Sequence, residues 1–195
     1  MTKIIKNTLL VVAFIPLLAM SAIELNTVPN VQTGDNNALS TQEMPNNTTT
    51  TINIDRLEKA LRINTYFQER SMPLAGYGMQ FVLVAEKYGL PYDLLPAIAV
   101  RESSGGKRLM NNNPFGWGSA KIKFSDFNEA IEVVGKNLGG GNPRTASYYG
   151  GKTVKQKLYT YNGTVITGYE DEVMSIMDKI DSTKIAEDTV LAYSK

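Results

Sequence analysis

Apolar residues recur at helical spacing in several stretches between residues 53 and 181, and polar or glycine-rich segments separate them. Phe81, Val84, Ala85 and Tyr88 fall at positions i, i+3, i+4 and i+7, which places them on one face of a helix that Gly89 ends. The same spacing predicts helices over residues 55–69, 127–138, 153–161 and 169–180. Their predicted inner faces are Leu57, Ala60 and Leu61; Phe127, Ile131, Val134 and Leu138; Val154, Leu158 and Tyr161; and Val173, Ile176, Met177 and Ile180.

Polar residues at the starts of these helices provide candidate caps. Asp55 and Asp126 each precede an apolar stripe, and Glu129 stands three residues after Asp126, as in a capping box. Thr153 begins the later helix, and the pair Asn162-Gly163 ends it.

The run of residues 94–106 predicts a short buried helix that glycine ends and that carries an acidic side chain in its last turn. Leu95, Ile98, Ala99 and Glu102 share one face, Asp93 is the expected N-cap, and glycine follows at 105. Apolar surroundings and the negative end of the helix dipole both raise the pKa of such a carboxyl. A carboxylic acid that stays protonated near neutral pH is suited to general acid catalysis. The alternative is a solvent-facing Glu102 paired with a nearby Arg or Lys.

The segment after this helix has a different pattern. Residues 105–125 lack helical period, residues 111–118 form a turn-rich loop, and residues 121–124 alternate like a short strand. The expected fold class is therefore α+β, mostly α, with a helical domain over residues 53–181 and a small β/loop insertion after the Glu102 helix.

The chain ends predict export and two extensions. Residues 1–21 combine Lys3 and Lys6 with an apolar run and a small-residue cleavage site, as a signal peptide does. The run is shorter than the ~20 residues that span a bilayer, so membrane attachment is expected only if this segment stays uncleaved. Residues 22–52 are rich in Asn and Thr and predict a disordered linker, and residues 182–195 predict a weakly ordered tail. The protein is expected to be secreted, periplasmic or cell-wall associated.

The amino-acid composition limits the kinds of catalytic and metal site that the chain can form. The chain of 195 residues contains no His and no Cys, which excludes His-dependent nucleophilic triads and zinc sites built on those ligands. Glycoside cleavage is the main reaction class that carboxylic acids carry out alone. The net charge of +1, with no basic stripe among aromatic residues, predicts no nucleic-acid partner. No metal and no cofactor are expected.

Three motifs together resemble a known family. Glu102-Ser103 ends an apolar helix, Asn112-Asn113-Pro114-Phe115-Gly116-Trp117 follows about ten residues later, and Tyr161-Asn162-Gly163 closes a later helix. This combination resembles the bacterial endo-β-N-acetylglucosaminidase domain of the lysozyme-like superfamily over roughly residues 75–180. Two features depart from that superfamily. The Gly-Leu-Met-Gln motif of many transglycosylases is absent, and Trp117 replaces the Ile common after Phe-Gly.

The resemblance implies a lysozyme-like fold, cleavage of β-1,4 bonds in peptidoglycan, Glu102 as proton donor, and a monomer acting on glycan strands. N-acetylglucosaminidase activity is preferred. Lytic transglycosylase or muramidase activity, and a non-catalytic cell-wall-binding module, remain alternatives. Tyr161 is the second expected catalytic residue, facing Glu102. The expected substrate contacts are Ser103, Asn112, Asn113, Phe115, Trp117, Tyr148 and Asn162.

Several of these residues have a competing structural role. Tyr161 and Phe115 also suit the core, and the asparagines also suit turns or a helix end. Trp117 lies between two glycines in a loop, which favours stacking on a sugar over filling the core. Asp126 and Glu129 are the nearest candidates for a second carboxylate, but a helix cap is their more ordinary role.

Overall fold

The computed structural model describes residues 47–186, with side chains described from residue 54 onward. This part of the chain is helical and contains no strand. The helices in order are α1 (Asn47–Glu69), α2 (Gly78–Tyr88), α3 (Leu94–Ser103), α4 (Phe127–Leu138), α5 (Ala146–Tyr149), α6 (Val154–Leu158), the π-helix η1 (Tyr159–Gly163) and α7 (Tyr169–Asp181). The predicted signal peptide at residues 1–21 and most of the predicted linker lie outside the described residues.

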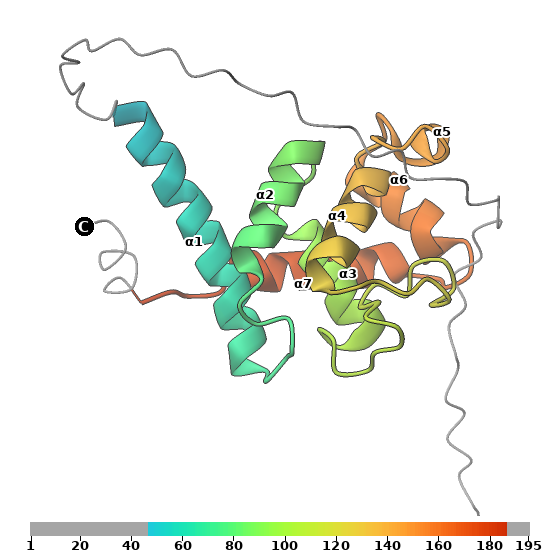
Figure 1. Cartoon of the computed structure of the whole chain (residues 1–195), viewed down its shortest axis with the longest axis horizontal. Helices are drawn as coiled ribbons and strands as arrows, with labels where there is room; N and C mark the ends of the chain where they lie inside the picture. The colour runs from blue at the N-terminus through green and yellow to red at the C-terminus, as the bar shows by residue number, and fades with distance from the viewer. Residues whose placement is uncertain (1–46, 187–195) are drawn as a thin grey trace, which may run out of the picture.

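Helix α3 is the centre of the domain. Every residue from Leu94 to Ala99 is buried, so this short helix is apolar around most of its circumference, as a fully enclosed helix must be. It packs chiefly on α7 and also contacts α2 and α4, while α1 packs on α2 and α7 (Figure 1). The last turn of α3, which carries Glu102, is thereby held from several sides.

Sequence periodicity predicted four of the surrounding helices correctly. The helix predicted over residues 169–180 is α7, with Val173 and Ile180 buried. Phe81, Val84 and Ala85 of α2 are buried, and Gly89 ends that helix with φ of 64°. In α4, the Asp126 carboxylate accepts a hydrogen bond from the Glu129 backbone N–H at 2.9 Å, as a capping aspartate does. Ile131, Val134 and Leu138 are buried beneath it. Thr153 caps α6 through a capping box with Gln156.

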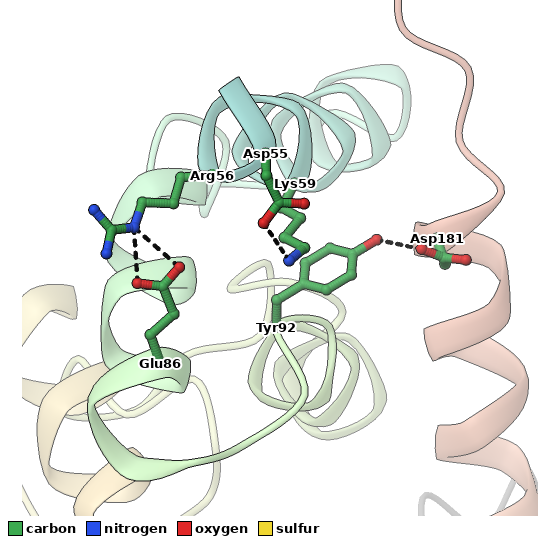
Figure 2. Close-up of polar contacts among 6 residues, drawn as sticks. All are labelled: Asp55, Arg56, Lys59, Glu86, Tyr92 and Asp181. Atoms are coloured by element: carbon green, nitrogen blue, oxygen red, sulfur yellow. Dashed lines mark hydrogen bonds and ion pairs between the residues drawn. The ribbon is translucent and has the colours of Figure 1, made fainter. Parts of the chain in front are cut away.

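Helix α1 is longer than predicted. It begins at Asn47, within the segment expected to be a linker, so Asp55 lies inside the helix and is not its N-cap. The Asp55 carboxylate instead accepts a hydrogen bond from Lys59 Nζ at 2.6 Å, one helical turn on (Figure 2). Leu57 and Leu61 are only half-buried, and the core face consists of Ala60, Ile63, Tyr66 and Phe67.

The predicted ends of α3 also require correction. Asp93 precedes the helix, but its side chain makes no capping hydrogen bond. The residue that ends α3 is Ser104, with φ of 56°, and glycines with positive φ follow directly at 105 and 106. A non-glycine residue in this left-handed region is uncommon, and the sequence pattern predicted a glycine.

Residues 121–124 do not form the predicted strand. Ile122 is 40% exposed and Phe124 is buried, whereas an alternating strand would place both on the same face. Ser119 and Ala120 both have φ of 58°, so the chain turns sharply just before this segment. The expected β/loop insertion is a loop, and the regular elements of the described residues are all helices.

Polar contacts at the surface join elements that are distant in sequence (Figure 2). Arg56 of α1 pairs with Glu86 of α2 at 2.8 Å, and the Tyr92 hydroxyl donates to Asp181 of α7 at 2.6 Å. Arg62 donates to the backbone carbonyls of Asp181 and Thr183 at 2.6 and 3.1 Å, so the start of the predicted tail packs on α1. Residues 187–195 of that tail lie outside the described residues. None of the described helices is long and apolar enough to cross a bilayer.

Candidate functional site

Glu102 lies half-buried in the last turn of α3, and its carboxylate oxygens have different surroundings. Oε1 accepts a hydrogen bond of 2.7 Å from the hydroxyl of Tyr169, the first residue of α7. Oε2 faces Gly116, where an added Cβ would lie 3.3 Å from this oxygen. Gly116 also has φ of 62°, which disfavours any other residue. One oxygen is therefore anchored, and a residue without a side chain flanks the other.

Burial raises the pKa of Glu102 above the ordinary value for a glutamate. The hydrogen bond from Tyr169, the positive charge of Arg101 and the nearby amide of Asn162 act in the opposite direction and lower this pKa. Burial is the largest of these influences, so the pKa stays raised. The direction agrees with the expectation from sequence, and burial of the Glu102 carboxyl is its main cause.

Four aromatic side chains pack together beside the acid. The rings of Tyr161 and Tyr169 are stacked, with centroids 6.1 Å apart and planes 7° from parallel. Trp117 packs on Tyr161 at 5.7 Å and on Tyr149 at 6.1 Å. The Tyr169 ring belongs to this aromatic cluster through Tyr161, and burial raises the pKa of Tyr169 well above its ordinary value. Tyr169 is therefore a neutral hydrogen-bond donor.

The expected contact between Tyr161 and Glu102 is not formed. The Tyr161 hydroxyl donates to the backbone carbonyl of Phe115 at 2.6 Å, which joins η1 to the loop after α3. The hydrogen bond expected of Tyr161 belongs to Tyr169. Tyr161 is connected to Glu102 only through other residues: its ring stacks on Tyr169, and its hydroxyl bonds to Phe115, the residue before Gly116.

The structure also bears on two other aromatic predictions. Trp117 is only 6% exposed and belongs to the aromatic cluster, so its ring is not available to stack on a sugar. Tyr148, expected to contact substrate, lies on the short helix α5 and is 49% exposed. Its neighbour Tyr149 is buried against Trp117.

The polar residues Ser103, Asn112 and Asn113, from the first two motifs, hold the loop around Gly116 in place through hydrogen bonds. Asn113 is buried, donates to the Trp117 carbonyl at 2.8 Å and accepts from the Trp117 N–H at 3.0 Å. Asn112 donates to the carbonyls of Phe124 and Ser125, at 3.1 Å in each case. Ser103 donates to the Ala99 carbonyl and accepts from the Gly106 N–H, both at 3.0 Å. These side chains were expected to contact substrate, and in the structure they fix the loop geometry.

Asn162 differs from these braced residues. It is fully buried in η1, next to Tyr161, and neither polar atom of its amide has a hydrogen-bond partner among the described residues. The amide lies near enough to Glu102 to lower the carboxyl pKa slightly, without a hydrogen bond of normal geometry. Leaving a buried polar group unpaired costs about 1–3 kcal/mol. Unsatisfied amides and π-helical turns both tend to occur at functional sites.

Among the residues that the structure describes, none of the groups that shift the pKa of Glu102 is a carboxylate. Glu129 accepts hydrogen bonds from the Ser125 N–H and hydroxyl at 2.6 and 2.7 Å, and Asp126 caps α4, so both serve the helix start. Within residues 47–186, no group of three or more Asp or Glu side chains is arranged to hold a metal ion.

Two shallow hollows of about 440 and 480 Å³ open on the described surface. Glu102 lines neither of them. Tyr159, Gln156 and Glu170 are among the residues that line the first, and Arg101, Glu172 and Ile176 are among those that line the second. The second hollow is lined by residues of α3 and α7, and one of them, Arg101, directly precedes Glu102 in the sequence.

No local pattern in the sequence marked Tyr169, the residue that hydrogen-bonds to Glu102. Tyr169 opens a helix and shows no local motif, and it reaches Glu102 only because α7 packs on α3. A scan against protein-family models, a search of curated proteins and a search of solved structures found no match to this chain.

Proposed function

We propose that this protein is an exported peptidoglycan hydrolase that cleaves β-1,4 glycosidic bonds of glycan strands, as an N-acetylglucosaminidase with a lysozyme-like helical domain. The observation that supports this proposal most strongly is the environment of the Glu102 carboxyl. This carboxyl is half-buried, its pKa is raised, Tyr169 anchors one of its oxygens, and a glycine flanks the other. That environment suits a general acid.

The arrangement supports a proton transfer from Oε2. Protonated Glu102 gives its proton to the glycosidic oxygen, the bond from that oxygen to the anomeric carbon breaks, and positive charge develops on the sugar. The Glu102 carboxylate that remains keeps the hydrogen bond from Tyr169 and the nearby charge of Arg101. A water molecule then attacks the anomeric carbon and gives a proton to the Glu102 carboxylate, which regenerates the acid.

The charge that develops on the sugar requires a second group. Because no carboxylate is among the groups that act on Glu102, the acetamido group of the substrate itself is the proposed assistant. The unpaired amide of Asn162 supports this proposal. It is a donor and an acceptor beside the acid, and it is suited to an acetamido or hydroxyl group of the sugar.

The proposed site of action is outside the cell membrane. It rests on the signal-like residues 1–21 and on the resemblance of the three motifs to glucosaminidases. The expected partner is a glycan strand of peptidoglycan, bound by a monomer without metal or cofactor.

Digestion of purified peptidoglycan followed by mass analysis of the products tests the proposal. Wild-type protein is expected to release fragments with reducing N-acetylglucosamine ends, and Glu102→Gln should release none above background. Glu86→Gln is a matched control, because it makes the same chemical change at an ion pair on α2. Anhydro-muramyl ends would indicate a lytic transglycosylase and reducing muramyl ends a muramidase. Binding to cell wall without any released fragment would indicate a non-catalytic module.

A further inference from the structure

Arg101 connects the residue next to the acid with an exposed carboxylate on α7. Its Nε donates a charge-assisted hydrogen bond to Oε2 of Glu172. Its guanidinium carbon also lies 5.7 Å from the ring centroid of Tyr169, within the range of a cation–π contact. The Arg101 side chain is 28% exposed and the Glu172 side chain 52%, so the pair sits at the edge of the aromatic cluster.

The geometry of α7 explains how one arginine makes both contacts. Tyr169 and Glu172 are three residues apart and lie on the same face of the helix. Arg101 lies against this face from α3, with Glu172 on one side and the Tyr169 ring on the other. A planar guanidinium suits this double role, since it can hydrogen-bond at its edge and pack through its face.

We propose that Arg101 is a positioning residue for the acid, held against Tyr169 by its ion pair with Glu172. This inference rests on the proposed function of Glu102. It adds that an exposed carboxylate, Glu172, controls through Arg101 both the orientation of the Tyr169 donor and the charge beside Glu102. Neither Arg101 nor Glu172 belongs to the motifs that resemble glucosaminidases.

The groups that face Glu102 come from every element packed around it. Arg101 of α3 supplies the positive charge, Tyr169 of α7 donates a hydrogen bond, and the loop contributes Gly116, which carries no charge. From η1 come the Asn162 amide and the Tyr161 ring, whose hydroxyl is engaged with Phe115. Arg101 is the one cation in this set, so its removal should raise the pKa of Glu102.

Removal of Glu172 distinguishes anchoring from simple electrostatics. Loss of a negative charge near the acid, by itself, lowers the pKa of Glu102. If Glu172 holds Arg101 in place, its loss also lets the guanidinium move into solvent, and this second effect raises the pKa of Glu102. The proposal therefore predicts a rise in Glu172→Ala, opposite to the direct effect of the lost charge.

The experiment is a pH titration of the full chain labelled with ¹³C at the glutamate carboxyl carbons, followed by NMR. The Glu102 signal is assigned by its disappearance in Glu102→Gln. The pKa of Glu102 should rise in Arg101→Gln and in Glu172→Ala, and it should stay near the wild-type value in Arg101→Lys, which keeps the charge. Asp171→Ala is the matched control, because it removes a neighbouring negative charge that pairs with Lys155 and not with Arg101. It should cause no rise.

The same variants should shift the alkaline limb of the pH profile of glycan release in the same direction, by the same amount as the NMR titration. An unchanged Glu102 pKa in Arg101→Gln, or a fall of this pKa in Glu172→Ala, would overturn the positioning role. The proposed function would then still stand, provided that the wild-type protein releases glycan. If wild-type protein releases no glycan, the proposed function fails, and with it the catalytic meaning of any pKa shift.

Discussion

Two hydrogen bonds from tyrosine to carboxylate join α3 to α7, one at each end of this antiparallel pair. Near the start of α3, Tyr92 donates to Asp181 at 2.6 Å in an exposed setting (Figure 2). Near its end, Tyr169 donates to Glu102 at 2.7 Å inside the aromatic cluster. The donors, acceptors and distances are nearly alike, so the surroundings make the difference between the two pairs.

Burial changes what the carboxylate can do. Asp181 is exposed, and its partner Tyr92 lies near Lys59, whose ammonium group is 5.8 Å from the Tyr92 ring centroid. Glu102 is shielded by α3, α7 and the Gly116 loop, and burial raises its pKa. A surface contact of the first kind contributes little to stability, whereas a desolvated carboxyl can hold a proton for transfer. The comparison favours a structural role for the exposed pair and supports the chemical role proposed for the buried pair.

The largest expected effect on stability concerns the aromatic cluster. Trp117→Ala removes a buried ring that contacts Tyr149 and Tyr161, and it should lower the free energy of unfolding by about 3–5 kcal/mol. Tyr148→Ala changes an exposed neighbour on α5 and should stay within about 0.5 kcal/mol of wild type. Urea unfolding of both variants is the measurement. A small loss for Trp117→Ala would return its ring to the list of candidate sugar contacts.

Tyr169→Phe and Tyr92→Phe test the two hydrogen bonds directly. Each substitution removes one hydroxyl and keeps the ring. We expect Tyr169→Phe to lower the rate of glycan release roughly 10-fold to 100-fold, because Glu102 loses its anchor and its charged form loses a donor. Tyr92→Phe should leave this rate unchanged. Equal rates for the two variants would remove the distinction between the ends of the helix pair.

The pH dependence of stability provides a further test near the Tyr92–Asp181 pair, where the carboxyl of Asp93 is buried. Burial raises the pKa of Asp93 from 3.8 to about 6, with smaller contributions from Asp181 and Asp178. Because the folded-state pKa lies above the unfolded value, this group's contribution to stability is complete below pH 4 and is lost as the pH rises through 6. Asp93→Asn should therefore be more stable than wild type by about 1–2 kcal/mol at pH 8, and the difference should vanish near pH 3. Urea unfolding at both pH values measures it, and no gain at pH 8 would contradict the account of Asp93.

Removal of divalent metal ions should have no effect on the proposed activity. Glycan release before and after treatment with a chelator is the test, with the Tyr169→Phe rate as a reference for a true loss. Activity that disappears with the chelator and returns with a divalent cation would show that the Glu102 site needs a metal.

Local patterns predicted the helices around the site better than the site itself. The stripe of α2, the Asp126 cap of α4 and the Thr153 start of α6 depend on residues within one or two turns, and all three are present. The burial of Glu102 was predicted for the same reason, because it follows from the apolar stripe of its own helix. The strand expected at residues 121–124 failed, because brief alternation cannot outweigh the turns at Ser119 and Ala120.

The remaining errors concern contacts between distant elements. Tyr161 and Tyr169 are both buried tyrosines, and only the antiparallel packing of α7 on α3 decides which hydroxyl reaches Glu102. Trp117 lies between two glycines, which suggests a loop, yet Tyr149 and Tyr161 arrive from other helices and enclose its ring. The spacing of residues along the sequence does not predict such contacts between distant elements.

The central claim is that the buried carboxylate, and not its exposed counterpart, performs the chemistry. The most direct test compares rates of glycan release from purified peptidoglycan by Glu102→Gln and Asp181→Asn, each of which replaces a carboxylate that accepts from a tyrosine with an amide. The rate should fall by about 10²–10⁴-fold in Glu102→Gln and stay within about twofold of wild type in Asp181→Asn. Retention of more than about a tenth of the wild-type rate in Glu102→Gln would contradict the account.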